Sequence, residues 1–377
     1  MLFAACLLAG RVSLLSGDHS ARAVSRIHTD HPGSIALDDI AVAAIGPAAD
    51  LSESWPPPAL PLAQQAAIVL TSGSTGAPSA ARKCWGELVA RSQAAAERFG
   101  LVGGGSPAIV GTVPPHHMYG FETTVLLPLH GDCASWCGPT FYPADIRAAL
   151  SEVRGRRILV TTPVHLRALL EQPLERPPEQ VISATAPLEQ ALAARARDEW
   201  GALVSEIFGA TEVGSIASRR TLDEAGWTLY PGIALSGTDE APVVHAPHAA
   251  PHPLSDIIER HPDGSGFLLL GRSGDLVKIG GRRASLEGLG RTLRAIDGVI
   301  DGVFIVPDDL NQRPGARLLA FAVAPGGDAR ALLAALRHEI DPLFLPRRLI
   351  LCDRLPRNEV GKLPREALRA LLDKADD

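Results

Sequence analysis

Short apolar runs alternate with helix-forming stretches between residues 66 and 270, and this alternation restricts the fold more than any other feature. The apolar runs lie at 67–70, 108–110, 158–160 and 181–182, and stretches rich in Ala, Arg and Glu lie at 87–99, 144–154 and 188–200. Strands that alternate with helices form mostly parallel sheets. We therefore predict an α/β fold with a large N-terminal domain of mostly parallel sheets and helices.

A second, smaller domain is predicted after residue 271. Strands are expected at 266–270, 302–306 and 318–323, and helices at 285–295 and 328–340. A chain of 377 residues is long enough for two or three domains, and about 105 residues is a usual domain size. The predicted boundaries are 1–271 for the large domain and 272–377 for an α+β domain.

The composition favours an enzyme that acts on small molecules. The net charge of −6 provides no bulk attraction for nucleic acid or an anionic membrane. The five cysteines lack the paired spacing of a disulfide or zinc framework, which favours buried thiols in a reducing cytosol. The opening apolar run at 2–9 is too short to span a bilayer and is expected to form a helix that Gly10 ends, before a strand near 12–15. We expect a cytoplasmic protein without a membrane span or a nucleic-acid partner.

A loop rich in hydroxyl groups and glycine follows the run at 67–70. Its residues are Thr71, Ser72, Gly73, Ser74, Thr75 and Gly76. Glycine allows the backbone to approach an anion, while hydroxyl groups and exposed amides donate hydrogen bonds to its oxygens. The loop differs from a Walker loop, because Pro78 stands where a second glycine would be. We predict a phosphate-binding loop; the alternative is an ordinary flexible turn.

Three further segments follow this loop in a recognisable order. They are Glu206-Ile207-Phe208-Gly209-Ala210-Thr211-Glu212, Asp275-Leu276-Val277-Lys278-Ile279-Gly280-Gly281-Arg282 and Leu355-Pro356-Arg357-Asn358-Glu359-Val360-Gly361-Lys362. Together with the loop, they resemble the motifs of the adenylate-forming superfamily of acyl-CoA synthetases, luciferases and peptide-synthetase adenylation domains. The resemblance covers the chain from about residue 66 and is closest to short stand-alone acyl or aryl acid ligases.

The resemblance implies an AMP-forming acid–thiol ligase. Such an enzyme activates a carboxylic acid, here an aryl or fatty acid, to an acyl-adenylate with release of pyrophosphate. A thioester then forms on coenzyme A or on the phosphopantetheine arm of an acyl carrier protein. The implied ligands are ATP and Mg²⁺, and the C-terminal domain is implied to be a mobile lid.

The resemblance also assigns the nucleotide contacts. It implies that the loop residues Thr71 to Gly76 hold the β- and γ-phosphates. Thr211 and Glu212 would face the α-phosphate and Mg²⁺, with Glu212 as the metal ligand, because Mg²⁺ prefers oxygen ligands. The remaining residues assigned to the nucleotide include contacts with adenine and ribose, the latter partly from the domain junction at Arg272. They are Ala184, Thr185, Phe208, Gly209, Asp256, Arg272 and Lys278.

Two further residues are assigned to catalysis by the resemblance. Lys362 would stabilise the charge that develops as the carboxylate attacks the α-phosphorus; the alternative is a solvated surface lysine. His117 lies in Pro114-Pro115-His116-His117-Met118-Tyr119-Gly120 and would border the acid. Its alternative is a histidine at a helix start that is bonded only to backbone.

Departures from the family pattern leave alternatives open. Ser79 stands where the family usually has lysine, so either pyrophosphate binding is weaker or Lys83 substitutes. Gly274 replaces the usual Asp or Lys at the hinge, where glycine keeps rotation open. A degenerate relative that binds nucleotide as a sensor or scaffold stays an alternative, as does an unrelated α/β enzyme such as a kinase, which would release ADP.

The phosphate loop also begins closer to the N-terminus than in typical relatives, so one layer of the large domain is expected to be abbreviated. Either the ligase is compact, or its start lies upstream of Met1, and exposed apolar surface or a homodimer is then expected. Residues 238–256, rich in Pro, His and Ala, predict an irregular loop. They do not predict a metal site, because no Cys or acidic residue has ligand-like spacing with His245, His248, His252 and His261.

Overall fold

The chain divides into two compact units. The computed structural model describes residues 2–18, 20–37, 42, 58–71, 79–103, 105–272, 276–279, 282–307, 317–357, 363, 367 and 370–372. The large unit comprises residues 1–234 and 244–252, and the small unit comprises residues 235–243 and 253–377. We describe each unit by itself, and the predicted domain boundary at residue 271 stays a prediction.

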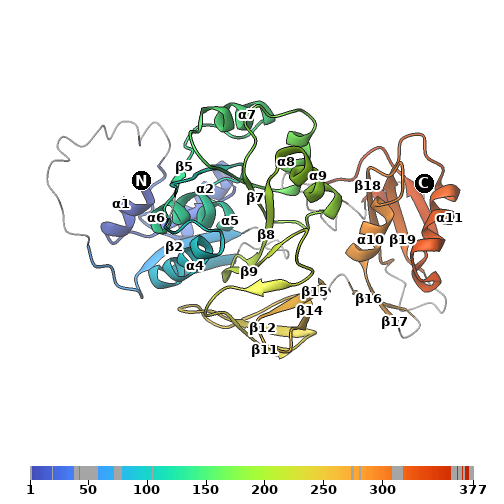
Figure 1. Ribbon diagram of the computed structural model, residues 1–377. Helices are drawn as coiled ribbons and strands as arrows, with labels where there is room; N and C mark the ends of the chain where they lie inside the picture. The colour runs from blue at the N-terminus through green and yellow to red at the C-terminus, as the bar shows by residue number, and fades with distance from the viewer. Residues whose placement is uncertain are drawn as a thin grey trace. The chain divides into compact units, whose positions relative to one another are not determined.

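The main sheet of the large unit has parallel central strands (Figure 1). Neighbouring strands in the parallel part are β5 (Ala134–Ser135), β4 (Ala108–Gly111), β6 (Arg157–Thr161), β7 (Gln180–Ser183) and β8 (Leu203–Ala210). Two antiparallel strands continue the sheet beyond β8, and they are β9 (Gly214–Arg220) and β10 (Trp227–Leu229). The predicted α/β class is confirmed, since four of the predicted apolar runs form β2, β4, β6 and β7.

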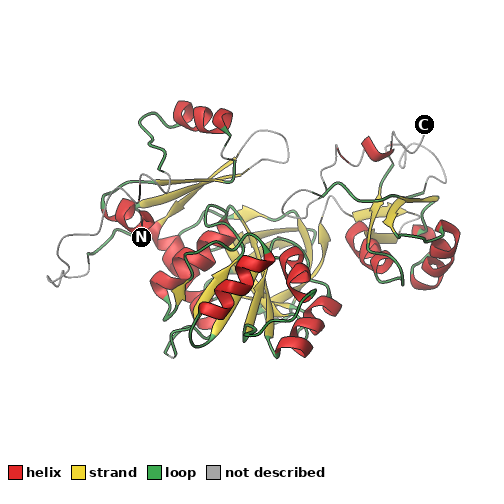
Figure 2. Ribbon diagram, turned by 90° about the horizontal axis from the view of Figure 1, so that it is seen from above, coloured by secondary structure: helices red, strands yellow, loops and turns green. Residues whose placement is uncertain are grey.

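Helices cover this sheet on both sides (Figures 1 and 2). One face is covered by α7 (Pro143–Glu152), α8 (Pro163–Leu170) and α9 (Gln190–Trp200), whose leucines pack against buried valines of β4, β7 and β8. The helices on the other side are α4 (Trp85–Arg98), α5 (Met118–Gly120), the π-helix η1 (Phe121–Leu126) and α6 (Leu127–His130). The parallel strands are therefore enclosed, which explains their continuous apolar sequences.

A smaller sheet carries the N-terminal part of the large unit. Strand β1 (Ser13–Ser16) pairs parallel with β2 (Gln65–Thr71), which pairs antiparallel with β3 (Ser79–Cys84). Helix α1 (Leu2–Leu8) precedes β1 in the chain, and α2 (Ala21–Asp30), whose N-cap is Ser20, follows β1. Phe3 and Leu7 of α1 pack with Leu88 and Phe121 in one apolar core. The predicted N-terminal helix and strand are confirmed, with Gly10 in a left-handed conformation between them.

Two strands lie within the range 238–256, where the sequence predicted an irregular loop. They are β12 (Ala241–His245) and β13 (His252–Pro253), and β11 (Ala234–Thr238) ends at the first residue of this range. The prediction is wrong for these residues, because the adjacent β-branched Val243 and Val244 favour extended backbone more strongly than the surrounding Pro and His residues disfavour it.

The small unit contains paired strands and helices. Two of its antiparallel pairs are β14 (Asp256–Arg260) with β15 (Gly266–Arg272), and β16 (Leu276–Ile279) with β17 (Arg282–Ser285). A separate sheet has the order β18 (Asp301–Ile305), β19 (Leu319–Val323) and β20 (Arg348–Leu351). Its core contains side chains of α10 (Leu286–Arg294), α11 (Ala329–Glu339) and the 3-10 helix η2 (Pro342–Phe344). Across the described residues, no helix is long and apolar enough to cross a membrane.

Candidate functional site

The parallel strands of the large unit bring several predicted site residues to one edge. Strand β7 ends at Ser183, directly before Ala184 and Thr185, and β8 ends at Ala210, directly before Thr211 and Glu212. Ser183 and Glu206 are register partners, so the two strand ends are adjacent. Ligands of open α/β sheets bind outside the carboxyl ends of the strands. This edge is therefore the candidate site.

A tight hairpin presents Thr211 and Glu212 at this edge. The Val213 amide donates to the Ala210 carbonyl at 3.1 Å and closes the turn between β8 and β9. Gly209 is required by the close approach of the two strands, because a Cβ there would lie 2.5 Å from the Gly214 oxygen. The hairpin thus places the two predicted catalytic residues at its turn.

The carboxylate and the backbone of Glu212 have different environments. The side chain is 43% exposed, and its Oε2 lies 3.8 Å from Nε2 of His252. The backbone carbonyl accepts a hydrogen bond from the buried ammonium of Lys83. Glu212 therefore has a fixed backbone and an accessible carboxylate.

The donor set at Glu212 fits a magnesium ion held mainly by phosphate oxygens. Mg²⁺ is usually bound in such sites by one or two carboxylates, with water and substrate phosphates completing its coordination. Within the described ranges, no cluster of three or more His, Cys, Asp or Glu side chains could hold a metal by itself. Glu212 can supply one carboxylate to an ion of this kind.

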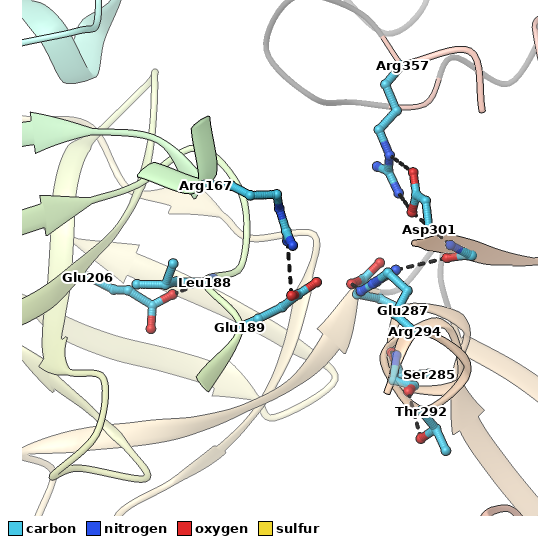
Figure 3. A network of polar contacts seen from close by, with 12 residues as sticks. Arg167, Leu188, Glu189, Glu206, Ser285, Glu287, Thr292, Arg294, Asp301 and Arg357 are labelled. Carbon is cyan, nitrogen blue, oxygen red and sulfur yellow. Dashed lines mark hydrogen bonds and ion pairs between the residues drawn. The ribbon is translucent and has the colours of Figure 1, made fainter. Parts of the chain in front are cut away.

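The predicted adenine-facing segment is tied to β8 by a buried carboxylate (Figure 3). Glu206 Oε1 accepts from the Leu188 amide at 2.9 Å, and Arg219 Nε donates to Glu206 Oε2 at 2.8 Å. Thr185 has a φ of 77°, which is strained for a β-branched residue. Such strain persists only where the surroundings impose it and is typical of ligand sites. Leu188 therefore anchors the segment that contains Ala184 and Thr185.

Phe208 lies on the same strand and has an aromatic neighbour. Its ring centroid is 5.5 Å from that of Trp227, with the planes inclined at 57°. The guanidinium of Arg219 lies 4.8 Å above the Trp227 ring. Phe208 is only partly buried. Adenine stacking on Phe208 stays a prediction.

His117 occupies the N-cap position of α5, and its side chain makes no capping hydrogen bond there. Its ring centroid lies 4.9 Å from that of His116. A Cβ on Gly17 would lie 2.8 Å from Cε1 of His117, so the end of β1 approaches this ring closely. The structure thus places the N-terminal sheet beside His117, and the contact of His117 with the acid stays a prediction.

Lys83 belongs to a buried ionic cluster that we define as Lys83, Glu87, Arg91 and Glu122. The ammonium of Lys83 lies 2.6 Å from Oε1 of Glu87 and also donates to the Glu212 carbonyl. Burial raises the pKa of Glu87, while the adjacent Lys83 lowers it. The structure places the Lys83 ammonium on these two partners, and its substitution for the missing loop lysine stays a prediction.

Glu122 binds the other side of the hairpin. Its Oε1 accepts from the Ser215 amide at 3.0 Å, and its Oε2 accepts from the Ser215 hydroxyl at 2.6 Å. Burial raises the pKa of Glu122 above its ordinary value, against the lowering effect of Ser215 and Lys83. The native chain therefore retains this proton at a pH where the unfolded chain has lost it.

The Glu122→Gln variant tests this shift. As pH rises from the ordinary glutamate pKa through the raised pKa of Glu122, the native wild type binds more protons than the unfolded chain, so its stability falls. Glutamine removes this dependence while preserving an acceptor for Ser215. We expect wild type to lose about 1.4 kcal/mol relative to the variant for each unit of pKa elevation. Urea unfolding at pH 5 and pH 8 measures this loss; parallel pH profiles would contradict it.

The small unit brings the two predicted ribose contacts opposite each other. Asp256 and Arg272 are register partners in the β14–β15 pair, and Asp256 is buried. The Arg272 side chain lies outside the described residues, as do the side chains of Thr71 and Lys278, whose backbones lie in β2 and β16. The predicted residues that lie wholly outside the described part are Ser72, Gly73, Ser74, Thr75, Gly76, Gly274 and Lys362.

The C-terminal motif is anchored just before Lys362 (Figure 3). Arg357 forms two hydrogen bonds with Asp301 of β18, from Nε to Oδ2 at 2.6 Å and from Nη2 to Oδ1 at 2.7 Å. Paired bonds of this kind fix the planes of both groups. The start of the motif is therefore attached to the sheet of the small unit.

Comparisons with known proteins identify the family. The model of a family described as AMP-binding enzyme matches residues 6–250. A 4-coumarate–CoA ligase of Rhodobacter capsulatus is 32% identical over 280 residues, which cover 72% of this chain and 66% of the relative. A probable 2-succinylbenzoate–CoA ligase of Mycobacterium tuberculosis is 28% identical over 341 residues, which cover 82% of this chain and 86% of that relative. The chain belongs to the AMP-binding enzyme family, so the predicted adenylate-forming superfamily is confirmed. The chain spans just under two thirds of the length of the coumarate ligase.

Solved structures confirm the fold. ATP-bound MatB from Rhodopseudomonas palustris matches with a TM-score of 0.76 at 20% identity, covering 100% of this chain and 82% of that chain. The anthranilate CoA ligase AuaEII in complex with anthranoyl-AMP matches with a TM-score of 0.73 at 16% identity, covering 99% and 81%. The architecture of a large N-terminal and a small C-terminal part is shared with these proteins.

Sequence reasoning missed three parts of the site. Glu87 and Glu122 were not singled out, and His252 was considered only as a metal ligand and rejected. Lys83 and Glu87 are four residues apart, but Lys83 lies on β3 and Glu87 on α4, so the spacing rule for pairs on one helix does not predict their contact. The contacts of Glu122 with Ser215 and of His252 with Glu212 join residues far apart in the sequence and have no local signal.

Proposed function

We propose that this protein activates a carboxylic acid with ATP, forming an acyl-adenylate and pyrophosphate, and then transfers the acyl group to a thiol. The observation that carries this proposal is the hairpin at the carboxyl edge of the main sheet. There the backbone of Glu212 is held by Lys83 while its carboxylate is accessible. Family membership and the order of the sequence motifs support the same reaction.

The residues at this edge have roles that follow from their chemistry. The Glu212 carboxylate supplies an oxygen ligand to Mg²⁺, which when bound offsets the negative charge of the phosphates. The Thr211 hydroxyl donates to an α-phosphate oxygen, and Phe208 stacks on adenine. Asp256 accepts from a ribose hydroxyl. Lys362 places an ammonium beside the attacking carboxylate and the α-phosphate, where charge develops.

An aryl acid is the first substrate class to test, with coenzyme A as the first acceptor. Three of the four relatives and neighbours named above are a 4-coumarate–CoA ligase, a probable 2-succinylbenzoate–CoA ligase and an anthranilate CoA ligase. A fatty acid and a holo acyl carrier protein form the second pair. A Mycobacterium tuberculosis relative named as a medium/long-chain-fatty-acid–[acyl-carrier-protein] ligase, 29% identical over 121 residues, motivates it.

Product analysis tests the proposed reaction. The protein is incubated with Mg²⁺, ATP and a panel of aryl and fatty acids, with coenzyme A or holo carrier protein as acceptor. We expect acid-dependent AMP and a new acyl thioester, identified by mass spectrometry. Acid-dependent ADP would contradict the proposal, since it indicates attack at the γ-phosphate.

The Glu212→Gln variant tests the metal role. Glutamine keeps the shape of the side chain and its backbone contact with Lys83 but weakens a hard oxygen ligand. We expect the Mg²⁺ concentration for half-maximal activity to rise at least tenfold, since the loss of even an outer-shell partner of a metal ligand costs about 10–100-fold in metal affinity or activity. Glu224→Gln is the control, because Glu224 forms a surface pair with Arg98. An unchanged Mg²⁺ dependence in Glu212→Gln would remove this assignment.

A further inference from the structure

We propose that Lys83 is a positioning residue that fixes the backbone of Glu212 at the nucleotide edge. This inference rests on the proposed function, because it concerns the residue that we assign to Mg²⁺. Lys83 lies on β3, the strand that follows residues 72–78, and Glu212 lies 129 residues later. One buried ammonium thus connects the strand after the predicted phosphate loop to the predicted metal ligand.

The contacts of Lys83 are directional. Its side chain is fully buried, and its ammonium binds Glu87 Oε1 at 2.6 Å and the backbone carbonyl of Glu212. Glu87 lies in the first turn of α4 and is itself buried, so a helix packed in the core holds the ammonium. The ammonium therefore has a fixed location from which it orients the Glu212 carbonyl.

A second buried charge holds the hairpin beyond Glu212. Glu122 binds both the amide and the hydroxyl of Ser215. Gly214 lies between the two attachment points with a φ of 91°, and a Cβ there would collide with Oε1 of Glu122. The Lys83 ammonium thus holds the turn at the Glu212 carbonyl, and the Glu122 side chain holds it at Ser215.

Charge balance explains how the cluster is tolerated in the core. Lys83 and Arg91 each lower the pKa values of Glu87 and Glu122, so the cluster sets two basic side chains against two acidic ones. A buried ion pair contributes little to stability compared with apolar residues of similar volume. The geometry of this cluster nevertheless directs a donor at one particular backbone carbonyl, which a pair of apolar residues cannot do. A displacement of about 1 Å at a reacting centre can reduce a rate by about 100-fold, so fixing this backbone has a catalytic consequence.

The double variant Lys83→Met/Glu87→Leu separates positioning from stability. It removes both charges of the pair and the donor to Glu212, and it fills the space with apolar side chains. Glu224→Gln is the control, because it alters a surface ion pair with Arg98 and leaves both contacts of Lys83 in place. Acid-dependent pyrophosphate exchange provides kcat together with the KM for the acid, and hydrogen exchange reports on the amides of residues 211–215.

We expect the double variant to lose at least tenfold in kcat, with the KM for the acid within twofold of wild type. Amides of residues 211–215 should exchange at least tenfold faster, while amides of β6 and β7 stay protected. Glu224→Gln should stay within about threefold of wild type in both measurements. A folded double variant with wild-type kcat and wild-type protection of residues 211–215 would overturn the proposal.

The experiment also separates this proposal from the proposed function. If wild type shows no exchange with any acid, the proposed function fails, and hydrogen exchange still decides whether Lys83 holds the turn. Lys83→Leu/Glu87→Met is a second apolar pair if the first does not fold. Failure of both pairs to fold would assign the cluster to stability and contradict the positioning role.

Discussion

The Lys362→Ala variant is expected to form acyl-adenylate at least 100-fold more slowly than wild type. This is a loss of about 2.7 kcal/mol of transition-state stabilisation. The reason is that alanine removes the one ammonium that we place beside the attacking carboxylate and the α-phosphate. Charge that develops in the transition state is then left without its compensating donor. Stopped-flow or quench-flow measurement of adenylate formation provides the rate.

Lys374→Ala is the control for this variant, since Lys374 is another lysine near the C-terminus and lies outside the Pro-Arg-Asn-Glu-Val-Gly-Lys motif. It should retain the wild-type rate. The affinity for ATP should change much less in Lys362→Ala than the rate does. A Lys362→Ala protein that forms adenylate at the wild-type rate would remove Lys362 from the reaction.

The Lys83→Met variant is expected to lower the free energy of unfolding by about 3–5 kcal/mol. Methionine matches the length of lysine but leaves the Glu87 carboxylate buried without its cation. An uncompensated buried charge is far more costly than a well-packed apolar pair. Urea unfolding monitored by circular dichroism, with the transition of the large unit fitted separately, measures the loss.

Lys83→Met/Glu87→Leu should recover most of this stability, because it leaves no unpaired charge at the site. The comparison between the single and the double variant therefore isolates the cost of the orphaned carboxylate. A single variant that is less than 1 kcal/mol below wild type would show that the Lys83–Glu87 pair is solvated rather than buried.

Local sequence signals predicted the main sheet. The apolar runs at 108–110, 158–160 and 181–182 became β4, β6 and β7, because fully enclosed parallel strands need apolar side chains on both faces. These runs depend on neighbours in the sequence, which is why they were accessible without a structure.

The interior of the site was less predictable. A lysine before a helix normally remains in solvent, and nothing near Lys83 in the sequence reveals that it contacts residue 212. His252 reaches Glu212 through the return of the chain after β12, in a region whose Pro and His content had suggested a loop. These contacts depend on how distant segments pack, and composition does not encode that packing.

Acid-dependent exchange between ATP and labelled pyrophosphate tests the central claim most directly, because it reports adenylate formation without requiring the thiol acceptor. We predict that wild type incorporates label into ATP in the presence of Mg²⁺ and at least one aryl or fatty acid, and that Lys362→Ala loses at least 99% of this rate. Wild-type protein that binds ATP but exchanges no label with any acid of the panel would contradict the account and would favour a nucleotide-binding sensor.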